Sequence, residues 1–325
     1  MKAIVCKAFG PPANLTLEEV ELPSLGEKEV LVQVKACGLN FPDTLIIQGL
    51  YQVRPELPFT PGSDIAGVVK AVGSKVKGLK EGTEVFGFAP NGGFAEEAIM
   101  PAKTCFPKPP MMDFPTAASF MIAYGTSYHA LKDRAKLKEG ETLLVLGASG
   151  GVGLAAVELG KLMGAKVIAA ASTDEKLALC KKYGADELIN YAKEDLKTRV
   201  KELTEGKGAD VVYDPVGGDF SEAALRATAW EGRFLVIGFA AGDIPKIPLN
   251  LTLLKGCSIV GVFWGTFASK SPDKNMANTM QMMQWLAEGK LKPHIHKVYA
   301  LADAPQALQD MMNRQVSGKS VIGIG

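Results

Sequence analysis

The stretch Thr142-Leu143-Leu144-Val145-Leu146-Gly147-Ala148-Ser149-Gly150-Gly151-Val152-Gly153 decides how this chain folds. Its start, residues 142–146, is apolar and predicts a strand, and an amphipathic helix pattern follows the turn. From Ala148 onward the turn reads A-x-G-x-x-G, the dinucleotide-binding fingerprint with its first glycine replaced by alanine. We expect Ala148 at the sharp turn, Gly150 close to a pyrophosphate, and Gly153 where the helix contacts the strand. The free N–H groups of the first helical turn would then face the phosphates.

The sequence after this motif alternates between strand and helix patterns. Apolar runs that predict strands occur at residues 142–146, 166–171, 187–189, 209–213, 233–237 and 258–263. Helical patterns separate most of them, and this alternation is typical of a doubly wound parallel sheet. Beyond the sheet we expect a helix at 272–287, a strand near 297–301, a helix at 304–313 and a last strand at 320–324.

The segment before the motif is rich in strand patterns. Residues 30–36 alternate between two faces, and residues 65–72 and 84–88 are short strands bounded by glycines. Glycine, proline and asparagine turn signals interrupt the segment at short intervals. This pattern predicts a compact, barrel-like β domain, which a proline-rich connector at 101–115 and helical patterns over 116–135 join to the motif.

The composition is that of an ordinary globular protein. The chain has 325 residues, of which 47% are hydrophobic and 22% charged, so it is long enough for two domains. Lysine plus arginine (36) nearly balances aspartate plus glutamate (35), which argues against a nucleic-acid partner or an anionic membrane surface. No apolar run predicts a membrane span or a secretion signal, so we expect a cytoplasmic protein. The five scattered cysteines form no C-x-x-C pair, and we expect reduced thiols, mostly in cores.

Several further motifs accompany the fingerprint: Cys37-Gly38-Leu39-Asn40-Phe41-Pro42-Asp43, Pro61-Gly62-Ser63-Asp64-Ile65-Ala66-Gly67, Tyr183-Gly184-Ala185-Asp186, Asp210-Val211-Val212-Tyr213-Asp214 and Gly318-Lys319. Together they resemble the medium-chain dehydrogenase/reductase superfamily, and within it the zinc-free NADPH:quinone oxidoreductase (zeta-crystallin-like) family. The resemblance implies an α/β fold, with a GroES-like β-barrel catalytic domain at 1–122 and 266–325 and a Rossmann doubly wound parallel-sheet domain at 123–265. It also implies a cofactor cleft between these domains, at the carboxyl ends of the strands.

Two positions bear on metal chemistry. Where the zinc alcohol dehydrogenases of this superfamily carry zinc-binding cysteine and histidine, this chain has Asn40 and Ser63. Neither side chain suits zinc, which favours thiolate, imidazole and carboxylate groups. The lobe that holds a second zinc in those enzymes is also missing. We therefore expect metal-free chemistry and no metal site.

The end of the second Rossmann strand bears on the cofactor. An NAD-preferring domain usually ends this strand with an acid that holds the ribose hydroxyls. Here it ends Ala169-Ala170-Ala171-Ser172-Thr173, which leaves room for a 2′-phosphate, and Lys176 follows one turn into the next helix. Asp174 and Glu175 suit the helix dipole, and Ser172 with Glu175 has capping-box spacing. NADPH is therefore the expected cofactor.

The resemblance also implies a set of site residues. The expected catalytic residues are Asn40, Asp43 and Tyr51, of which Asp43 fits a helix-capping acid equally well. An amide such as Asn40 can hold the carboxamide or an acceptor oxygen, and the Tyr51 hydroxyl can stabilise an oxygen that gains negative charge. The expected cofactor-binding residues are Asn40, Thr126, Ala148, Ser149, Gly150, Gly151, Val152, Ser172, Lys176, Tyr191, Val216, Gly238, Phe239, Phe263, Trp264 and Arg314.

Some of these assignments have an equal alternative. Lys176, Tyr191 and Arg314 would surround the 2′-phosphate, but a solvated surface side chain accounts for Arg314 equally well. Phe263, Trp264 and also Phe267 fit an aromatic wall of the cleft, and they fit a core or a subunit interface as well.

A metal-free hydride transfer needs an acceptor that is already electrophilic. A quinone is the favoured acceptor, and an enone or enoyl-thioester (acryloyl-CoA-type) reductase is the alternative. The alternative reaction requires a proton donor, for which Tyr51 is the candidate. A non-catalytic NADPH- or RNA-binding zeta-crystallin-like protein is an alternative of another class, and the near-neutral charge counts against RNA.

The stretch Cys257-Ser258-Ile259-Val260-Gly261-Val262-Phe263-Trp264 bears on assembly. It fits the sixth strand of the sheet, which lies at an edge in the doubly wound order 3-2-1-4-5-6. An apolar edge strand without charge or proline is an aggregation hazard if left open. We expect a two-fold partner to pair with it, giving a homodimer, and the chain's own C-terminal segment is the alternative cover.

Overall fold

The computed structural model describes all residues 1–325, and the chain forms two compact units. Unit 1 comprises Met1–Ile122 and Pro293–Gly325, and unit 2 comprises Ala123–Lys292. None of the helices combines the length and apolar character that a membrane crossing requires.

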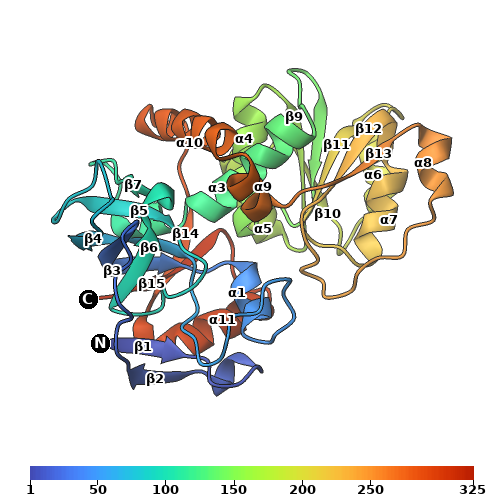
Figure 1. Ribbon diagram of the computed structural model, residues 1–325. Helices are drawn as coiled ribbons and strands as arrows, with labels where there is room; N and C mark the ends of the chain where they lie inside the picture. The colour runs from blue at the N-terminus through green and yellow to red at the C-terminus, as the bar shows by residue number, and fades with distance from the viewer. The chain divides into compact units, whose positions relative to one another are not determined.

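Unit 2 is built on one sheet whose six strands lie in the order β10-β9-β8-β11-β12-β13 (Figure 1). All five strand pairings are parallel, so this is the doubly wound order expected from the sequence. The strands are β8 (Thr142–Val145), β9 (Lys166–Ala171), β10 (Glu187–Asn190), β11 (Ala209–Asp214), β12 (Thr228–Val236) and β13 (Ser258–Gly261). The helices are α3 (Met121–Tyr128), which starts at the unit boundary, the π-helical turn η3 (His129–Arg134), α4 (Gly151–Leu162), α5 (Asp174–Lys182), α6 (Leu196–Leu203), α7 (Asp219–Arg226), α8 (Asn250–Lys255), α9 (Trp264–Lys270) and α10 (Pro272–Ala287).

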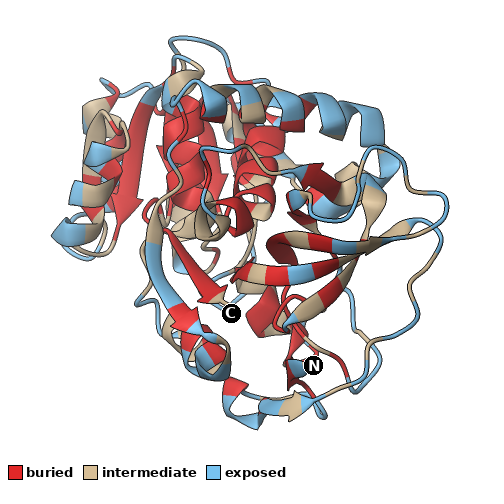
Figure 2. Cartoon of the chain, turned by 90° about the vertical axis from the view of Figure 1, so that its left-hand side faces the viewer, coloured by how far each residue is buried: buried red, intermediate tan, exposed pale blue.

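The inner strands of this sheet are buried along almost their whole length, as the colouring of Figure 2 shows for the strands of this unit. β8 buries Leu143, Leu144 and Val145 completely, and β9 buries every residue after Lys166. Such continuous apolar runs are typical of parallel strands that helices cover on both faces. These unbroken apolar runs are the feature from which the sequence analysis predicted the strands.

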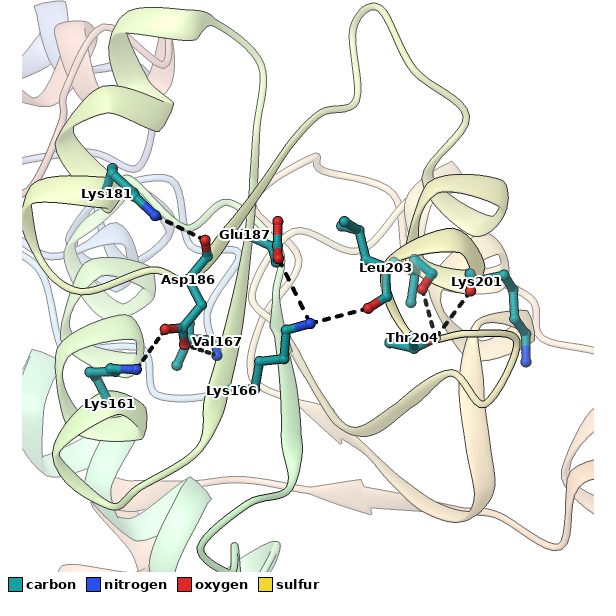
Figure 3. A network of polar contacts seen from close by, with 10 residues as sticks. Lys161, Lys166, Val167, Lys181, Asp186, Glu187, Lys201, Leu203 and Thr204 are labelled. Atoms are coloured by element: carbon teal, nitrogen blue, oxygen red, sulfur yellow. Dashed lines mark hydrogen bonds and ion pairs between the residues drawn. The ribbon is translucent and has the colours of Figure 1, made fainter.

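Asp186 fixes the amino ends of two neighbouring strands (Figure 3). Its carboxylate accepts hydrogen bonds from the Val167 N–H in β9 (2.8 Å) and from Lys161 Nζ in α4 (2.6 Å). Its carbonyl oxygen accepts one from Lys181 Nζ in α5 (2.9 Å). Asp186 belongs to one of the motifs that carry the family resemblance. Its role is structural, because it lies away from the carboxyl ends of the strands.

Unit 1 contains a seven-stranded sheet in the order β14-β15-β3-β4-β5-β7, with β6 paired to β3, and a two-stranded sheet β1-β2. Its strands are β1 (Lys2–Val5), β2 (Thr16–Glu19), β3 (Glu29–Gly38), β4 (Asp64–Val72), β5 (Glu84–Phe88), β6 (Glu97–Pro101), β7 (Cys105–Pro107), β14 (Ile295–Ala300) and β15 (Lys319–Gly323). Its helices are α1 (Phe41–Ile46), α2 (Phe114–Ala118) and α11 (Ala304–Met312), with the short turns η1 (Pro12–Asn14), η2 (Ala102–Thr104) and η4 (Leu301–Asp303).

The C-terminal strand completes the sheet of unit 1 and brings distant residues together. β15 pairs antiparallel with β3 through Val321 and Gly38, and β3 pairs antiparallel with β4 through Gly38 and Asp64. The start of β15, the end of β3 and the start of β4 therefore meet at one end of the sheet. Lys319 is the first residue of β15 and lies at this end.

The chain re-enters unit 1 at Pro293, whereas the sequence analysis placed this boundary at residue 266. The chain stays in unit 2 until Lys292 because α9 and α10 are fastened there. Trp264 packs so closely on Gly125 that a Cβ there would lie 2.8 Å from the indole ring. Asn278 in α10 donates to Asp133 Oδ2 and accepts from Lys132 Nζ, both at 2.8 Å.

Candidate active site

The fingerprint loop of unit 2 turns at residues 146–149, which include the predicted turn residue Ala148. Gly147 has φ +53°, a left-handed conformation that favours glycine, whereas Ala148 is an ordinary buried residue whose N–H donates to the Ala170 carbonyl (3.0 Å). Gly150 caps α4, and a Cβ on Gly153 would lie 2.3 Å from the Gly147 carbonyl oxygen. Gly153 therefore packs against the loop that follows β8, and Ala148 lies within the turn, where Gly147 has the left-handed conformation.

The next strands contribute residues beside this loop. A Cβ at Gly147 would lie 2.8 Å from Val216 Cγ2, so Val216 packs directly on the loop. Asp214, the last residue of β11, accepts hydrogen bonds from the backbone N–H groups of Val216 (2.8 Å) and Gly217 (2.9 Å) and from Ser221 Oγ (2.6 Å). These three bonds hold the turn after β11 in one shape.

Phe239 and Gly238 join the same turn from β12. The Gly217 position, with φ +73°, has room only for hydrogen because a Cβ there would lie 2.9 Å from the Phe239 ring. The Gly238 N–H points to the Asp214 carbonyl oxygen at 3.4 Å. Val216, Gly238 and Phe239 therefore gather at the carboxyl ends of neighbouring strands, where parallel sheets bind their ligands.

The end of β9 has no acidic residue at its tip. The strand ends at Ala171, and Ser172 follows half-buried. The helix cap is Thr173, whose Oγ1 accepts the Lys176 N–H at 3.3 Å, so the expected cap at Ser172 is wrong by one residue. Tyr191 lies beside this tip, because its N–H donates to the Ala171 carbonyl oxygen at 3.1 Å. The structure thus brings Ser172, Lys176 and Tyr191 to one place in unit 2.

The helix α3 lies against the fingerprint helix. Ser127 Oγ donates to the Val152 carbonyl oxygen at 2.9 Å and is 2.8 Å from the Tyr213 hydroxyl. Thr126 is the preceding residue and is half-buried. This contact places Thr126 next to the helix whose first turn faces the predicted phosphate site.

The aromatic residues after β13 have different surroundings. Trp264 is 7% exposed, and its indole N–H donates to Asn275 Oδ1 at 3.0 Å, so its side chain belongs to the packing of unit 2. Phe267 stacks on the His129 ring with a centroid distance of 3.8 Å. Phe263 is 48% exposed and is available to a ligand or partner.

In unit 1 the head of α1 carries two of the expected catalytic residues. Asn40 is the helix cap, and Asp43, three residues on, accepts the Asn40 backbone N–H at 2.7 Å. Asp43 thus makes the capping contact that was its alternative role. Burial raises its pKa to about 7, while the Asn40 N–H and the charge of Lys319 act in the opposite direction.

Lys319 reaches the same place from the C-terminal strand. Its Nζ donates to the Leu39 carbonyl oxygen (2.6 Å) and to the Asn40 amide oxygen (2.5 Å), and it lies 4.0 Å from Asp64 Oδ2. Burial lowers the pKa of Lys319, and the charges of Asp64 and Asp43 oppose that shift. The Asn40 amide is therefore held by an ammonium group, and we call Asn40, Asp43, Asp64 and Lys319 the buried polar cluster.

Asp64 is the least satisfied member of the cluster. It is 0% exposed, its Oδ2 accepts the Ile122 N–H at 3.4 Å, and its Oδ1 has no hydrogen-bond partner. Burial raises its pKa to about 7, against the opposing charge of Lys319. With two carboxyl groups and one ammonium group, the buried polar cluster is balanced when one of the acids holds a proton.

Tyr51 and Arg314 lie at the surface of unit 1. Tyr51 is half-buried, and burial raises the pKa of its hydroxyl, with a further contribution from the charge of Asp43. Tyr51 therefore stays protonated at neutral pH and can donate a hydrogen bond. Arg314 is exposed and follows α11 with φ +60°.

The residues at the candidate zinc positions do not fit zinc. Ser63 Oγ donates to the Pro90 carbonyl oxygen at 3.1 Å, and the Asn40 amide oxygen accepts from an ammonium group. No group of three or more histidine, cysteine, aspartate or glutamate side chains is arranged to hold a metal ion. A second cation beside the Lys319 ammonium would also be repelled.

The glycine loop of unit 2, by contrast, fits a dinucleotide. At Gly147 and Gly153 a Cβ would meet a neighbouring atom at 2.8 Å or less, so the backbone lies as close to its surroundings as only glycine allows. The N-terminus of α4, a helix of 12 residues, begins directly after this loop at Gly151. Such a helix end offers free N–H groups to a phosphate.

Comparison with known proteins assigns the family. A profile for the alcohol dehydrogenase GroES-like domain matches residues 26–110, and a profile for zinc-binding dehydrogenases matches residues 151–286. The chain belongs to the medium-chain dehydrogenase/reductase superfamily and, within it, to the quinone oxidoreductase-like proteins. The family and fold class expected from the sequence are confirmed.

Three similar proteins illustrate the relationship. The quinone oxidoreductase-like protein 2 homolog of Nematostella vectensis is 41% identical over 324 residues, which is 99% of this chain and 88% of that protein. The Escherichia coli quinone oxidoreductase, solved in complex with NADPH, is 30% identical with a TM-score of 0.92 and covers 99% of this chain and 100% of its own. The CurK enoyl reductase is 26% identical with a TM-score of 0.91, covering 100% and 99%.

Proposed function

We propose that this protein is an NADPH-dependent reductase that transfers hydride to a quinone without a metal ion. The observation that carries the proposal is the Lys319 ammonium group bonded to the Asn40 amide oxygen, at a position where the zinc enzymes of the superfamily bind their metal. A site organised in this way offers no Lewis acid to activate an alcohol or a simple ketone. The acceptor must itself be electrophilic, and quinones meet that condition.

The end of β9 supports NADPH as the hydride donor. No acid stands at the tip of the strand, and the backbone N–H groups of Lys176 and Tyr191 bond to Thr173 and Ala171 beside it, which supports a role of these two residues at the 2′-phosphate. The nearest acid, Asp174, is engaged by Asn190 and Lys193. The bound nucleotide would supply the hydride, and Ala148, Ser149, Gly150, Gly151 and Val152 would hold its pyrophosphate through backbone N–H groups.

The polar residues of unit 1 suit the second half of the reaction. Reduction of a quinone to a hydroquinone by one hydride requires one proton, which water can supply. The Tyr51 hydroxyl is protonated at neutral pH and can donate a hydrogen bond to the acceptor oxygen as negative charge develops. Asp43, with a pKa of about 7, holds a proton for part of the time at neutral pH.

The proposal is tested by comparing acceptors. Steady-state oxidation of NADPH is measured with a naphthoquinone, a small enone and an enoyl-CoA. We expect kcat/KM to be highest for the naphthoquinone. A higher kcat/KM for the enoyl-CoA or the enone would show that the quinone is not the preferred acceptor, although the protein would still be a hydride-transferring reductase.

The second candidate function is reduction of an enone or enoyl thioester. The CurK enoyl reductase shares the fold over its whole length, which favours this candidate over unactivated ketones. Its chemistry needs a proton donor to carbon, and Tyr51 is the candidate in unit 1. Replacing Tyr51 by phenylalanine would abolish that reaction but only weaken quinone reduction, because the hydroquinone takes its proton from water.

A further inference from the structure

Asp174 lies at a position where an acidic residue would weaken the binding of NADPH. It is the first residue of α5 and follows the tip of β9 by three positions, in the region where Rossmann domains bind the adenosine ribose. Its side chain is 65% exposed. A bare carboxylate there would repel a 2′-phosphate, so a domain that binds NADPH must neutralise this charge.

Both oxygens of this carboxylate are engaged by the segment after β10. Oδ1 accepts from Asn190 Nδ2 at 2.6 Å, and Oδ2 accepts from Lys193 Nζ at 2.6 Å. Asn190 is 4% exposed, and its own N–H and amide oxygen are bonded to Glu194 and to the Ala192 N–H. A buried, fully bonded amide thus anchors the Asp174 carboxylate, and a lysine completes the contact.

Lys193 is the cation bound to Asp174, and the charges of Glu175 and Glu194 act on the same ammonium group. The hydrogen bond from Lys193, followed by the one from Asn190, lowers the pKa of Asp174, so the carboxylate is ionised at neutral pH and Lys193 balances it. Glu194, the residue after Lys193, lies 3.2 Å from Arg199, which also pairs with Glu202.

We propose that Lys193 is a positioning residue for cofactor choice: it neutralises Asp174 and, with Asn190, holds that carboxylate on the β10 side, so that the 2′-phosphate of NADPH is accepted. This rests on the proposed use of NADPH. Lys193 acts through Asp174 and does not itself bind the phosphate. The prediction is therefore a coupling between two side chains, which a double-mutant cycle measures.

The experiment measures dissociation constants for NADPH and NADH by nucleotide fluorescence. The variants are Lys193→Met, Asp174→Asn and the double variant, with Lys197→Met as the control. Lys197 is an exposed lysine that makes no hydrogen bond to Asp174. Lys193→Met should raise the dissociation constant of NADPH about three- to fivefold and change that of NADH by less than about twofold. The effect is small because the Lys193–Asp174 pair is exposed to solvent. The difference should shrink at high ionic strength, because salt screens exposed charges.

The double variant decides the mechanism. With Asp174→Asn already present, adding Lys193→Met should change the NADPH constant by less than about twofold. An equal loss of NADPH affinity in both backgrounds would show that Lys193 contacts the phosphate directly, and an equal loss for NADH would show a merely structural role; either result overturns the proposal. Failure of the proposed NADPH dependence would give a different result: the wild-type protein would bind NADH more tightly than NADPH.

Discussion

At the scale of single residues, the ammonium group of Lys319 organises a cluster that no sequence pattern predicts. Asn40 and Asp43 could be named from the family motif, and the capping role of Asp43 followed from its spacing. The bond between Lys319 and Asn40 joins residues 279 positions apart, and only the pairing of β15 with β3 brings them together. Sequence reasoning had noted Lys319 as a motif residue without assigning it a partner.

Replacing Lys319 by methionine should destabilise unit 1 in a pH-dependent way. Asp43 and Asp64 have pKa values raised to about 7 in the folded protein. Their contribution to stability is therefore present at low pH and is lost as the pH rises through about 7. Without the ammonium group both values rise further, so the variant should lose about 3–5 kcal/mol near pH 8 and clearly less near pH 6.

Urea unfolding at both pH values checks this prediction. Lys35→Met serves as the control, because Lys35 is a half-buried lysine of β3 in the same sheet. We expect the control to change the free energy of unfolding by less than about 0.5 kcal/mol. A loss for Lys319→Met that is the same at the two pH values would mean that packing of the side chain, and not its charge, is what matters.

Lys176→Ala should act on one cofactor only. If Lys176 binds the 2′-phosphate, its removal costs one charge-assisted contact, about 1.5–3 kcal/mol, and raises KM for NADPH roughly 10- to 150-fold. KM for NADH should hardly change, because NADH lacks the phosphate. Lys182→Ala, an exposed position in the last turn of the same helix, is the matched control. Equal effects on the two cofactors would remove Lys176 from the phosphate site.

At the scale of elements, apolar periodicity predicted most of unit 2 and left its turns less certain. The inner strands of the sheet, such as β8 and β9, were found because they are buried on both faces, and α10 was found with its observed bounds, Pro272–Ala287. The cap of α5 at Thr173 differs by one residue from the predicted Ser172, since either of these two neighbouring hydroxyl residues satisfies the sequence pattern. Only the backbone conformation distinguishes them.

Gly153→Ala should disturb the fingerprint without discriminating between cofactors. The new Cβ would lie 2.3 Å from the Gly147 carbonyl oxygen, which is backbone and cannot rotate away. We expect a loss of about 1–3 kcal/mol in stability and weaker binding of NADPH and NADH alike. Gly160→Ala in the same helix is the control, because its Cβ would meet side-chain atoms of Leu143 (2.5 Å) and Val167 (3.3 Å) and not the backbone of the fingerprint loop. Unchanged affinity for both nucleotides in Gly153→Ala would contradict a role of this turn in binding.

At the scale of the whole molecule, the edge of the unit 2 sheet bears on assembly. β13 pairs with β12 on one side and is the last strand of the sheet. Ile259 is 39% exposed on this strand, and Leu253 in the preceding helix α8 is 78% exposed. The C-terminal strand β15 belongs to the sheet of unit 1, so within this chain it does not pair with β13. The edge is therefore open within this chain, and the homodimer stays a prediction.

Ile259→Lys should therefore give a folded monomer, because a lysine on an edge strand opposes strand pairing between copies. Val260→Pro should also break the pairing, giving monomers or insoluble protein. Leu50→Lys, at a 67% exposed leucine of unit 1, is the control and should stay dimeric. Sedimentation velocity at micromolar concentration checks all of them, and an unmodified protein that sediments as a monomer would refute the dimer.

Metal-free hydride transfer is tested by NADPH oxidation with a naphthoquinone, using protein dialysed against a strong chelator and analysed for metal content. The buried polar cluster carries its own cation in Lys319, and the side chains at the two candidate zinc positions, Asn40 and Ser63, do not suit zinc. We predict full turnover by protein that contains no stoichiometric metal, and no gain when zinc is added. Turnover that disappears on dialysis and returns with zinc would contradict the account.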